Sequence, residues 1–430
     1  MTVLIAGGGI SGLALALSCH QVGIPFQVFE AAAQMRPLGV GINLQPTAVR
    51  ELWDLGLREQ LDEVGIPLQD YGLYTKRGLH VWTEPRGLDA GYHWPAYSVH
   101  RGRLQMMLYE TLIRRAGPEA VQTGWRAKGF STEGDKAVLM LESRTGEAKR
   151  VSGSVIIGAD GIHSALRAQM QPQEAEPKWS GAILWRGTTL AKPFLSGASM
   201  VLIGQPGLRF VAYPISAPAP DTGLAVINWI CNLQFDPARK FEKEDYSRKA
   251  DLDDFLPAFE QLRFDWLDAP ALIRGAAEVF EYPMVDRDPL DSWTAGRVTL
   301  MGDAAHAAYP VGSNGAGAGI MDARKLVAAF LAHGLNQRAL LAYEAEMLPV
   351  TSKIILTNRS AGPDKILDIL EARVGGDYSR VEDVITQAEM ADHAATYKRI
   401  AGTGIAEVNE RPPIVPEGAR FDARGPRVMP

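Results

Sequence analysis

Close to its start the chain reads VLIAGGGISG over residues 3–12. The apolar first half is typical of a buried strand, and the glycines after it predict a tight turn that opens a helix over residues 11–22. In this G-x-G-x-x-G pattern, Gly7 permits the turn, Gly9 lets the backbone approach a diphosphate, and Gly12 lets the helix pack close to the strand. The stretch therefore predicts a strand–turn–helix unit that binds the phosphates of a dinucleotide.

A carboxylate stands where such a unit needs one. Residues 26–30 predict a second strand, and Glu30 ends it, roughly 20 residues after the glycines, where a carboxylate can accept hydrogen bonds from ribose hydroxyls. The N-terminus of the helix adds N–H groups and a partial positive charge for the phosphates. The unit alone does not choose between FAD and NAD, and a lone glycine pattern could be a plain turn.

A second candidate motif follows an apolar strand at residues 155–158. It reads GADGIHS over residues 158–164 and contains Asp160. On its own, this motif is most simply read as an Asp-Gly turn.

A third motif follows a strand expected at residues 297–301. The chain there reads GDAAH at 302–306 and PVGSNGAG at 310–317, before a helix expected near residues 320–333. Asp303 could hold polyol hydroxyls such as those of a ribityl chain, and a helix N-terminus aimed at a flavin would stabilise its anionic reduced ring. The alternative is a flexible glycine loop before a helix.

Taken in this order and at these separations, the three motifs resemble the single-component (group A) FAD-dependent aromatic hydroxylases, which have the p-hydroxybenzoate hydroxylase fold. The resemblance covers about residues 1–360. Further stretches are similar to the phenazine hydroxylase branch, that of 5-methylphenazine-1-carboxylate monooxygenase; they are residues 36–46, 99–105, 184–187 and 282–289.

The resemblance implies FAD-binding roles for residues spread over the chain. They are Gly7, Gly9, Ile10, Ser11, Gly12, Glu30, Arg36, Gly41, Arg101, Gln105, Asp160, Asp303, Gly312, Gly315, Ala316 and Gly317. Arg101 and Gln105 would reach the phosphates and the ribityl chain, and residues 312–317 would border the isoalloxazine ring. Many members of the family carry Asn where this chain has Gly317, so a contact there would come from the backbone.

The resemblance also implies an activity. NADH or NADPH would reduce FAD, O2 would be captured as a flavin C4a-hydroperoxide, and one oxygen would pass to an aromatic or N-heteroaromatic small molecule. A carboxylate on that substrate could be lost during hydroxylation. No second dinucleotide pattern is present, as expected if the nicotinamide binds only transiently, and no catalytic side chain is assigned because the cofactor carries the chemistry.

The expected fold is α/β, with a Rossmann-like FAD-binding domain, an inserted and mostly antiparallel substrate sheet, and a C-terminal helical extension. The FAD-binding domain is expected at 1–75, 100–180 and 285–360, the substrate domain at 76–99 and 181–284, and C-terminal helices with a Pro-rich tail at 361–430. Strands of the inserted sheet are expected at 182–188, 200–203, 209–215 and 224–231, and C-terminal helices at 365–372 and 381–400.

The substrate pocket is expected between the inserted sheet and the flavin. Trp185, Arg186, Tyr213 and Trp229 lie on strands of that sheet, and alternation sends only some of them inward. The candidates for the pocket are Trp185, Arg186 and Tyr213. Arg186 could pair with a substrate carboxylate, but a surface ion pair would explain it equally well.

Composition narrows the function classes. The net charge of −6 shows no basic bias toward nucleic acid, and no apolar run reaches the roughly 18 residues of a membrane span. The two cysteines, Cys19 and Cys231, form no CxxC pair, which fits a reducing cytoplasm and argues against a dithiol flavoenzyme. The histidines show no metal-ligand spacing. We expect a cytoplasmic monomer or homodimer acting on a small aromatic molecule.

Three alternatives stay open. A flavin-dependent halogenase would carry a W-x-W-x-I-P stretch, which the chain lacks. An epoxidising or Baeyer–Villiger monooxygenase would use the same flavin peroxide. A non-catalytic FAD-binding scaffold would bind the cofactor without turnover.

Overall fold

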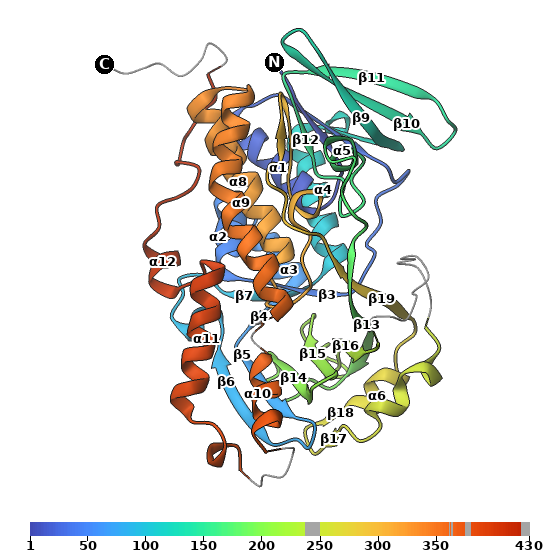
Figure 1. The fold of residues 1–430 in the computed structure, drawn as a ribbon, viewed down its shortest axis with the longest axis vertical. Coiled ribbons are helices and arrows are strands. Elements are labelled where there is room, and N and C mark those ends of the chain that lie inside the picture. Colours follow the sequence, from blue (N-terminus) through green and yellow to red (C-terminus); the bar gives the residue numbers. More distant parts are fainter. Residues whose placement is uncertain (237–249, 361, 363, 375–379, 423–430) are drawn as a thin grey trace.

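The computed structural model describes residues 1–236, 250–360, 362, 364–374 and 380–422. The end of the expected tail, 423–430, lies outside these residues. Figure 1 shows two large sheets, one in the upper and one in the lower part of the molecule, and the helices of the last quarter of the chain lie along one side of both. No described helix is long and apolar enough to cross a membrane.

The upper sheet has six strands in the order β20-β21-β12-β1-β2-β8. They are β1 (Val3–Ala6), β2 (Phe26–Glu30), β8 (Val121–Thr123), β12 (Val155–Gly158), β20 (Thr294–Ala295) and β21 (Val298–Leu300). All neighbours are parallel except the edge pair β20–β21. Because parallel strands end at the same edge of a sheet, the turns after β1, β12 and β21 lie together, which is where such sheets bind ligands.

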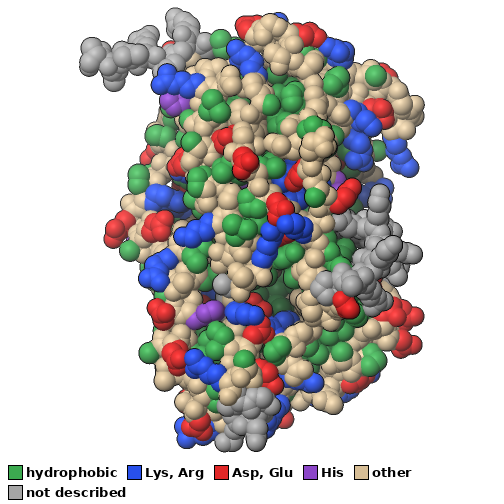
Figure 2. Space-filling model, viewed as in Figure 1, with side chains coloured by type: hydrophobic (Ala, Val, Ile, Leu, Met, Phe, Trp, Pro, Cys, Tyr) green, Lys and Arg blue, Asp and Glu red, His purple; other side chains and the backbone are tan. Residues whose placement is uncertain are grey.

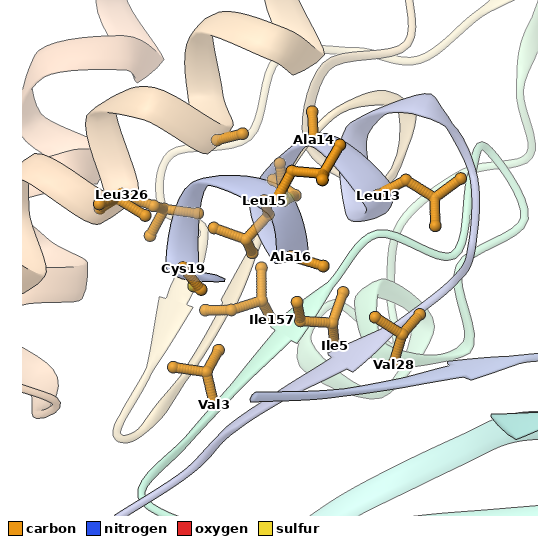
Figure 3. Close-up of a cluster of buried hydrophobic side chains, with 14 of the residues drawn as sticks. Val3, Ile5, Leu13, Ala14, Leu15, Ala16, Cys19, Val28, Ile157 and Leu326 are labelled. Carbon is orange, nitrogen blue, oxygen red and sulfur yellow. The ribbon is translucent and has the colours of Figure 1, made fainter. Parts of the chain in front are cut away.

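Helix α1 (Ile10–Val22) is apolar and buried around most of its circumference, and only His20 near its end is exposed. Figure 3 shows Val3, Ile5, Val28 and Ile157 of the sheet facing its residues from below, with Leu326 of α8 (Gly315–His333) beside it. Helix α4 (Arg101–Ala116) packs against it as well. Cys19 is a core residue, and burial raises the pKa of its thiol far above the usual range.

Two parts of the upper lobe were not predicted. One is the antiparallel sheet of β9 (Trp125–Glu133), β10 (Lys136–Ser143) and β11 (Ala148–Gly153), which projects at the upper right of Figure 1. The other is α9 (Gln337–Ser360), which continues through Pro349. The shorter helices here are α2 (Pro46–Asp54), α3 (Arg58–Val64), α5 (Ala165–Met170) and α7 (Asp303–His306).

The lower sheet has seven strands in the order β19-β13-β16-β15-β14-β5-β6. They are β5 (Asp70–Thr75), β6 (His80–Pro85), β13 (Lys178–Ala191), β14 (Ser199–Gln205), β15 (Leu208–Pro214), β16 (Ala225–Gln234) and β19 (Val279–Asp286). Every pair is antiparallel except β14–β5, so the prediction of an inserted, mostly antiparallel sheet is confirmed. The expected domain boundary after residue 75 separates β5 from the strands with which it pairs.

The strand register sorts the residues of the lower sheet onto two faces. Arg186 is opposite Ile230, and Ile230 is opposite Val211, so these residues share one face, which we call the site face. Trp185 and Phe210, each opposite Cys231, share the other, which we call the core face. The core face is covered by α6 (Ala269–Arg274), by the hairpin β17 (Arg263–Phe264) and β18 (Leu267–Asp268), and by short 3-10 turns at Leu252–Asp254 and Leu256–Phe259.

A small sheet joins the two lobes. It consists of β3 (Gly41–Leu44), β7 (Ala96–His100) and β4 (Gly65–Leu68), and in Figure 1 it lies between the two large sheets. The N–H of Gly41 donates to Oδ1 of Asn228 at 2.7 Å. The small sheet therefore faces the site face.

The C-terminal segment contains α10 (Lys365–Val374), a 3-10 turn (Val381–Asp383), α11 (Gln387–Ala401) and α12 (Ile405–Glu410). The helix predicted over 381–400 begins only at Gln387, because Thr386 and Glu389 form a capping box there.

The C-terminal segment packs against both lobes. Apolar residues of α10 pack on the distal part of the site face, where Arg209 of β15 donates to Asp368 at 2.6 Å and to Asp364 at 3.1 Å. Beyond α12, the N–H of Phe421 donates to the carbonyl of Val22 at the end of α1. The predicted helical extension is thus part of the compact fold.

Candidate active site

The turn after β1 presents the N-terminus of α1 to open space. Gly9 is the N-cap residue, and a Cβ placed on it would meet no described atom within 4 Å. Gly12 is required by close packing, because its Cβ would lie 2.1 Å from the carbonyl oxygen of Gly7. The side chain of Ile10 is buried, so this residue can offer a ligand only its backbone. The N–H groups of this first turn fit a diphosphate.

Glu30 is held by backbone on both sides. Its Oε2 accepts from the N–H of Gly8 and its Oε1 from the N–H of Ala32, each at 2.7 Å. A carboxylate has about four lone-pair sites, so both oxygens can still accept from ribose hydroxyls.

Helix α4 brings one of its two predicted cofactor residues to the glycine turn. Gln105 donates from Nε2 to the carbonyl oxygen of Gly8 at 2.8 Å. Arg101 is exposed at the first position of α4, and it lies near enough to Arg186 to influence the pKa of that guanidinium. Arg36 is exposed and donates to Oε1 of Gln34, so no contact in the structure ties it to the other cofactor residues.

Asp160 carries an orphaned acceptor. Its Oδ2 accepts from the N–H of Ala165 at 2.9 Å, whereas its Oδ1 is buried and has no hydrogen-bond partner among the described residues. Burial raises the pKa of this carboxyl. The residue follows β12 directly beside the glycine turn, since a Cβ on Gly7 would lie 2.2 Å from the carbonyl oxygen of Ala159. A ligand that donates a hydrogen bond would satisfy Oδ1.

The glycine turn and the third motif meet at Ser11. A Cβ on Gly302 would lie 2.6 Å from the Oγ of Ser11, and one on Gly319 would lie 2.0 Å from it. Asp303, next in the chain, is exposed and has no hydrogen-bond partner among the described residues. Asp303 follows Gly302, the residue that approaches Ser11 at the start of α1. Its exposed carboxylate can therefore accept a hydrogen bond from a ligand near the glycine turn.

Two histidines near the site form hydrogen bonds within the protein. His306 shares a hydrogen bond with Oδ2 of Asp322 at 2.6 Å, and the same oxygen accepts from the N–H of Gly302. Burial by itself would lower the pKa of His306, but the Asp322 carboxylate raises it overall. His100 caps α4 by accepting from the N–H of Gly102.

The loop before α8 presents a second open helix end. A Cβ on Gly315, the first residue of α8, would meet no described atom within 4 Å. Ala316 is partly buried against the main core, and a Cβ on Gly317 would lie 3.4 Å from Ala48 of α2. Of the predicted residues in this loop, Gly315 therefore fits an approach by a ligand best, and Gly317 serves packing. Gly312 contacts the C-terminal segment.

The site face carries a partly buried cation near the cofactor residues. Arg186 donates from Nη2 to the carbonyl oxygen of Gly41 at 2.8 Å, and its Nε is buried without a partner among the described residues. Tyr213 lies beside it, and the ring centroid of Tyr282 is 6.0 Å from the guanidinium carbon. Burial lowers the pKa of Arg186. In the described chain, no carboxylate forms an ion pair with it.

Trp185 lies on the opposite face from where it was expected. Its ring stacks on Phe255 at 4.8 Å between centroids, and its Nε1 donates to Oε2 of Glu281. Trp229 shares this core face and donates to the hydroxyl of Thr189. Of the three residues predicted for the substrate pocket, the structure brings together Arg186 and Tyr213 and leaves Trp185 in the core. A hollow near Phe194 and Trp266 belongs to the core-face side.

Sequence reasoning missed several residues at the site. Asn228 interrupts the apolar pattern of β16 and could have been noticed as a polar residue in a buried strand. Tyr282 stands in one of the stretches that resemble the phenazine hydroxylase branch, but it received no role. Tyr397 of α11 lies far along the chain, and no local pattern marks it. No group of three metal-ligating side chains is found in the described ranges.

The face of the molecule drawn in Figure 2 carries mixed charges. In Figure 2, acidic and basic side chains are interspersed over the visible face, with no large area of one sign. The features described above that fit a ligand are the open helix ends, the Asp160 acceptor and the partly buried Arg186.

Comparisons with known proteins agree with this geometry. Residues 1–357 match the family described as FAD binding domain. The phenazine 1,6-dicarboxylic acid hydroxylase of Lysobacter antibioticus is 41% identical over 362 residues, which are 83% of this chain and 89% of that protein. The salicylate hydroxylase of Pseudomonas putida is 29% identical over 414 residues, covering 90% of this chain and 89% of the relative.

A solved structure shows the same fold. Klebsiella pneumoniae HpxO, crystallised with FAD and uric acid, superposes with a TM-score of 0.70 at 23% identity over 95% of each chain.

Proposed function

The chain belongs to the FAD binding domain family and is an FAD-dependent aromatic monooxygenase that uses NAD(P)H and O2, and from this premise we propose that its own substrate is a planar N-heteroaromatic carboxylate held by Arg186. The observation that carries the proposal is a partly buried guanidinium, its Nε fully buried, that has no carboxylate partner in the described part of the chain. A buried charge without a counter-ion is costly, and a substrate carboxylate would supply one.

The surroundings of Arg186 suit such a ligand. Its Nη2 is held by the carbonyl of Gly41, and a carboxylate that reached the guanidinium would accept a charge-assisted hydrogen bond. Tyr213 adds a hydroxyl, and Tyr282 adds an aromatic ring on the same side. The most similar relative reported above is named for a phenazine dicarboxylic acid, a fused N-heteroaromatic acid, which supports the same substrate class.

We further propose how the chain holds FAD. The open N-terminus of α1 would take the diphosphate, Glu30 the ribose hydroxyls, and Asp303 the ribityl hydroxyls, with Gln105 fixing the glycine turn. The unpartnered Oδ1 of Asp160 and the open end of α8 at Gly315 fit the same group. Bound FAD supplies the reduction of O2, while these residues orient the cofactor and the substrate and exclude water.

Location and assembly are also proposed. Two buried free thiols, Cys19 and Cys231, support a reducing compartment, the cytoplasm. We propose a monomer or homodimer, which the mass in solution would decide.

The test is NAD(P)H consumption against pairs of aromatic molecules that differ only in a carboxylate, including pyridine, quinoline and phenazine acids, with the product mass recorded. We expect the acids to stimulate oxidation at lower concentration than their neutral partners and to yield products with one added oxygen. The product mass also shows whether the carboxylate is kept. Equal stimulation by neutral and carboxylated partners would contradict the role of Arg186, and a purified protein that took up no FAD would overturn the proposal altogether.

A further inference from the structure

The C-terminal segment reaches the loop before α8 through one tyrosine. The hydroxyl of Tyr397 on α11 accepts from Nδ2 of Asn314 at 2.9 Å. It also lies 2.9 Å from Oδ1 of Asn358 and 3.3 Å from the carbonyl oxygen of Val311, the two acceptors for its single proton. One side chain thus connects α11, α9 and both ends of residues 311–314.

The fit at Gly312 is equally close. Gly312 has φ +72°, and a Cβ placed on it would fall 1.8 Å from the Tyr397 hydroxyl oxygen. The hydroxyl therefore occupies the place that a side chain at position 312 would take. Asn358 reinforces the same loop, because its Nδ2 donates to the carbonyls of Tyr309 and Val311, each at 3.1 Å.

Asn314 is diverted from a capping role by this contact. It stands at the N-cap position of α8, yet its side chain forms no cap hydrogen bond and its amide is used on Tyr397. The N–H groups at the start of α8 are thereby left to a ligand, next to Gly315, where a side chain would meet open space.

We propose that Tyr397 is a positioning residue for the oxidation reaction: it fixes residues 311–314 so that the start of α8 is held against the flavin and water is kept out. The inference rests on the proposed cofactor site. Tyr397 lies beyond residue 357, where the match to the FAD binding domain family ends. The C-terminal segment then completes the active site, in addition to covering the sheet.

Loss of the Tyr397 hydroxyl should change how tightly NAD(P)H oxidation is coupled to hydroxylation of the substrate. The productive reaction is NAD(P)H + H⁺ + O2 + ArH → NAD(P)⁺ + ArOH + H2O. When water reaches the site before the substrate is oxidised, the same electrons leave as hydrogen peroxide: NAD(P)H + H⁺ + O2 → NAD(P)⁺ + H2O2. A looser loop should raise the yield of hydrogen peroxide relative to hydroxylated product without abolishing NAD(P)H oxidation.

The experiment compares Tyr397→Phe with Tyr92→Phe in the full-length protein. Tyr92 is the matched control, because its hydroxyl also binds the C-terminal segment, at the carbonyl of Thr403, but does not contact the loop. We expect Tyr397→Phe to raise the fraction of NAD(P)H that ends as hydrogen peroxide several-fold, to weaken FAD binding, and to shift the visible spectrum of bound FAD. Tyr92→Phe should leave all three readouts at the wild-type value.

Asn314→Ala provides a second route if Tyr397→Phe folds poorly. It should reproduce the spectral shift, and the double variant should add little to Tyr397→Phe, because that change already removes the hydrogen bond to Asn314. Wild-type spectrum, FAD affinity and coupling in both Tyr397→Phe and Asn314→Ala would overturn the inference. A wild-type protein that neither binds FAD nor oxidises NAD(P)H would instead overturn the proposed function.

Discussion

The two faces of the seven-stranded sheet share the same strands and differ in almost everything else. The core face buries Trp185 and Trp229 against Phe255 and a set of short turns. The site face carries Arg186 and polar neighbours, and it meets the small sheet and α10. The difference teaches that one step along a strand separates a residue that serves stability from one that can serve chemistry.

The largest effect should come from breaking the core face. Trp229→Ala removes a fully buried indole and its hydrogen bond to Thr189, so the free energy of unfolding should fall by about 3–5 kcal/mol. Urea unfolding followed by circular dichroism measures the loss. A fall below 1 kcal/mol would show that the two faces do not differ in this way.

Arg186→Met should leave stability nearly unchanged and damage catalysis. Loss of one charge-assisted hydrogen bond to a substrate carboxylate, about 1.5–3 kcal/mol, corresponds to roughly a 10- to 100-fold fall in kcat/KM for acids. Neutral analogues should lose little. Arg209→Met is the control, since Arg209 shares the site face but is paired with Asp364 and Asp368, and it should not alter the preference for acids.

Tyr213→Phe should have a smaller kinetic effect, about 0.5–1.5 kcal/mol in kcat/KM, because it removes one hydroxyl beside Arg186. It also has a pH signature. Burial raises the pKa of Tyr213 from 10.0 to about 12. This contribution to stability is complete below pH 10 and is lost as pH rises through 12. The unfolding free energy of the variant should therefore decline less steeply over that interval, and identical slopes would argue against a buried neutral phenol.

The smallest kinetic effect is expected for Trp185→Phe. A phenyl ring can keep the stack on Phe255, and only the hydrogen bond to Glu281 is lost, at a cost of about 0.5–1.5 kcal/mol in stability. Because Trp185 is on the core face, KM and kcat should equal those of the wild type. A changed substrate preference would place Trp185 in the pocket after all.

Features that a local sequence pattern marks could be predicted, and features that depend on contacts between distant residues could not. The glycine turn, Glu30 and the strand before Asp303 are local patterns, and the fold and the FAD-dependent activity that they indicated are confirmed. The strands of the inserted sheet were also predicted. Their facing was not, because period-two alternation says which residues share a face but not which face meets the cofactor domain.

Other misses have equally physical causes. Helix α9 continues through Pro349, a residue that normally marks a helix end. Tyr397 touches a loop more than 80 positions earlier in the chain, and no periodicity reports a contact of that kind.

The burial of α1 has a consequence for biosynthesis. This helix is apolar around most of its circumference, and α8, one of the helices that cover it, ends only at His333. At about 5–20 residues per second, a ribosome needs on the order of 15–60 s after making α1 before that cover emerges. During this interval α1 exposes apolar surface on the nascent chain, and chaperones bind surface of this kind. The FAD site that we propose includes the start of α8, so it would be complete only after this helix has been made.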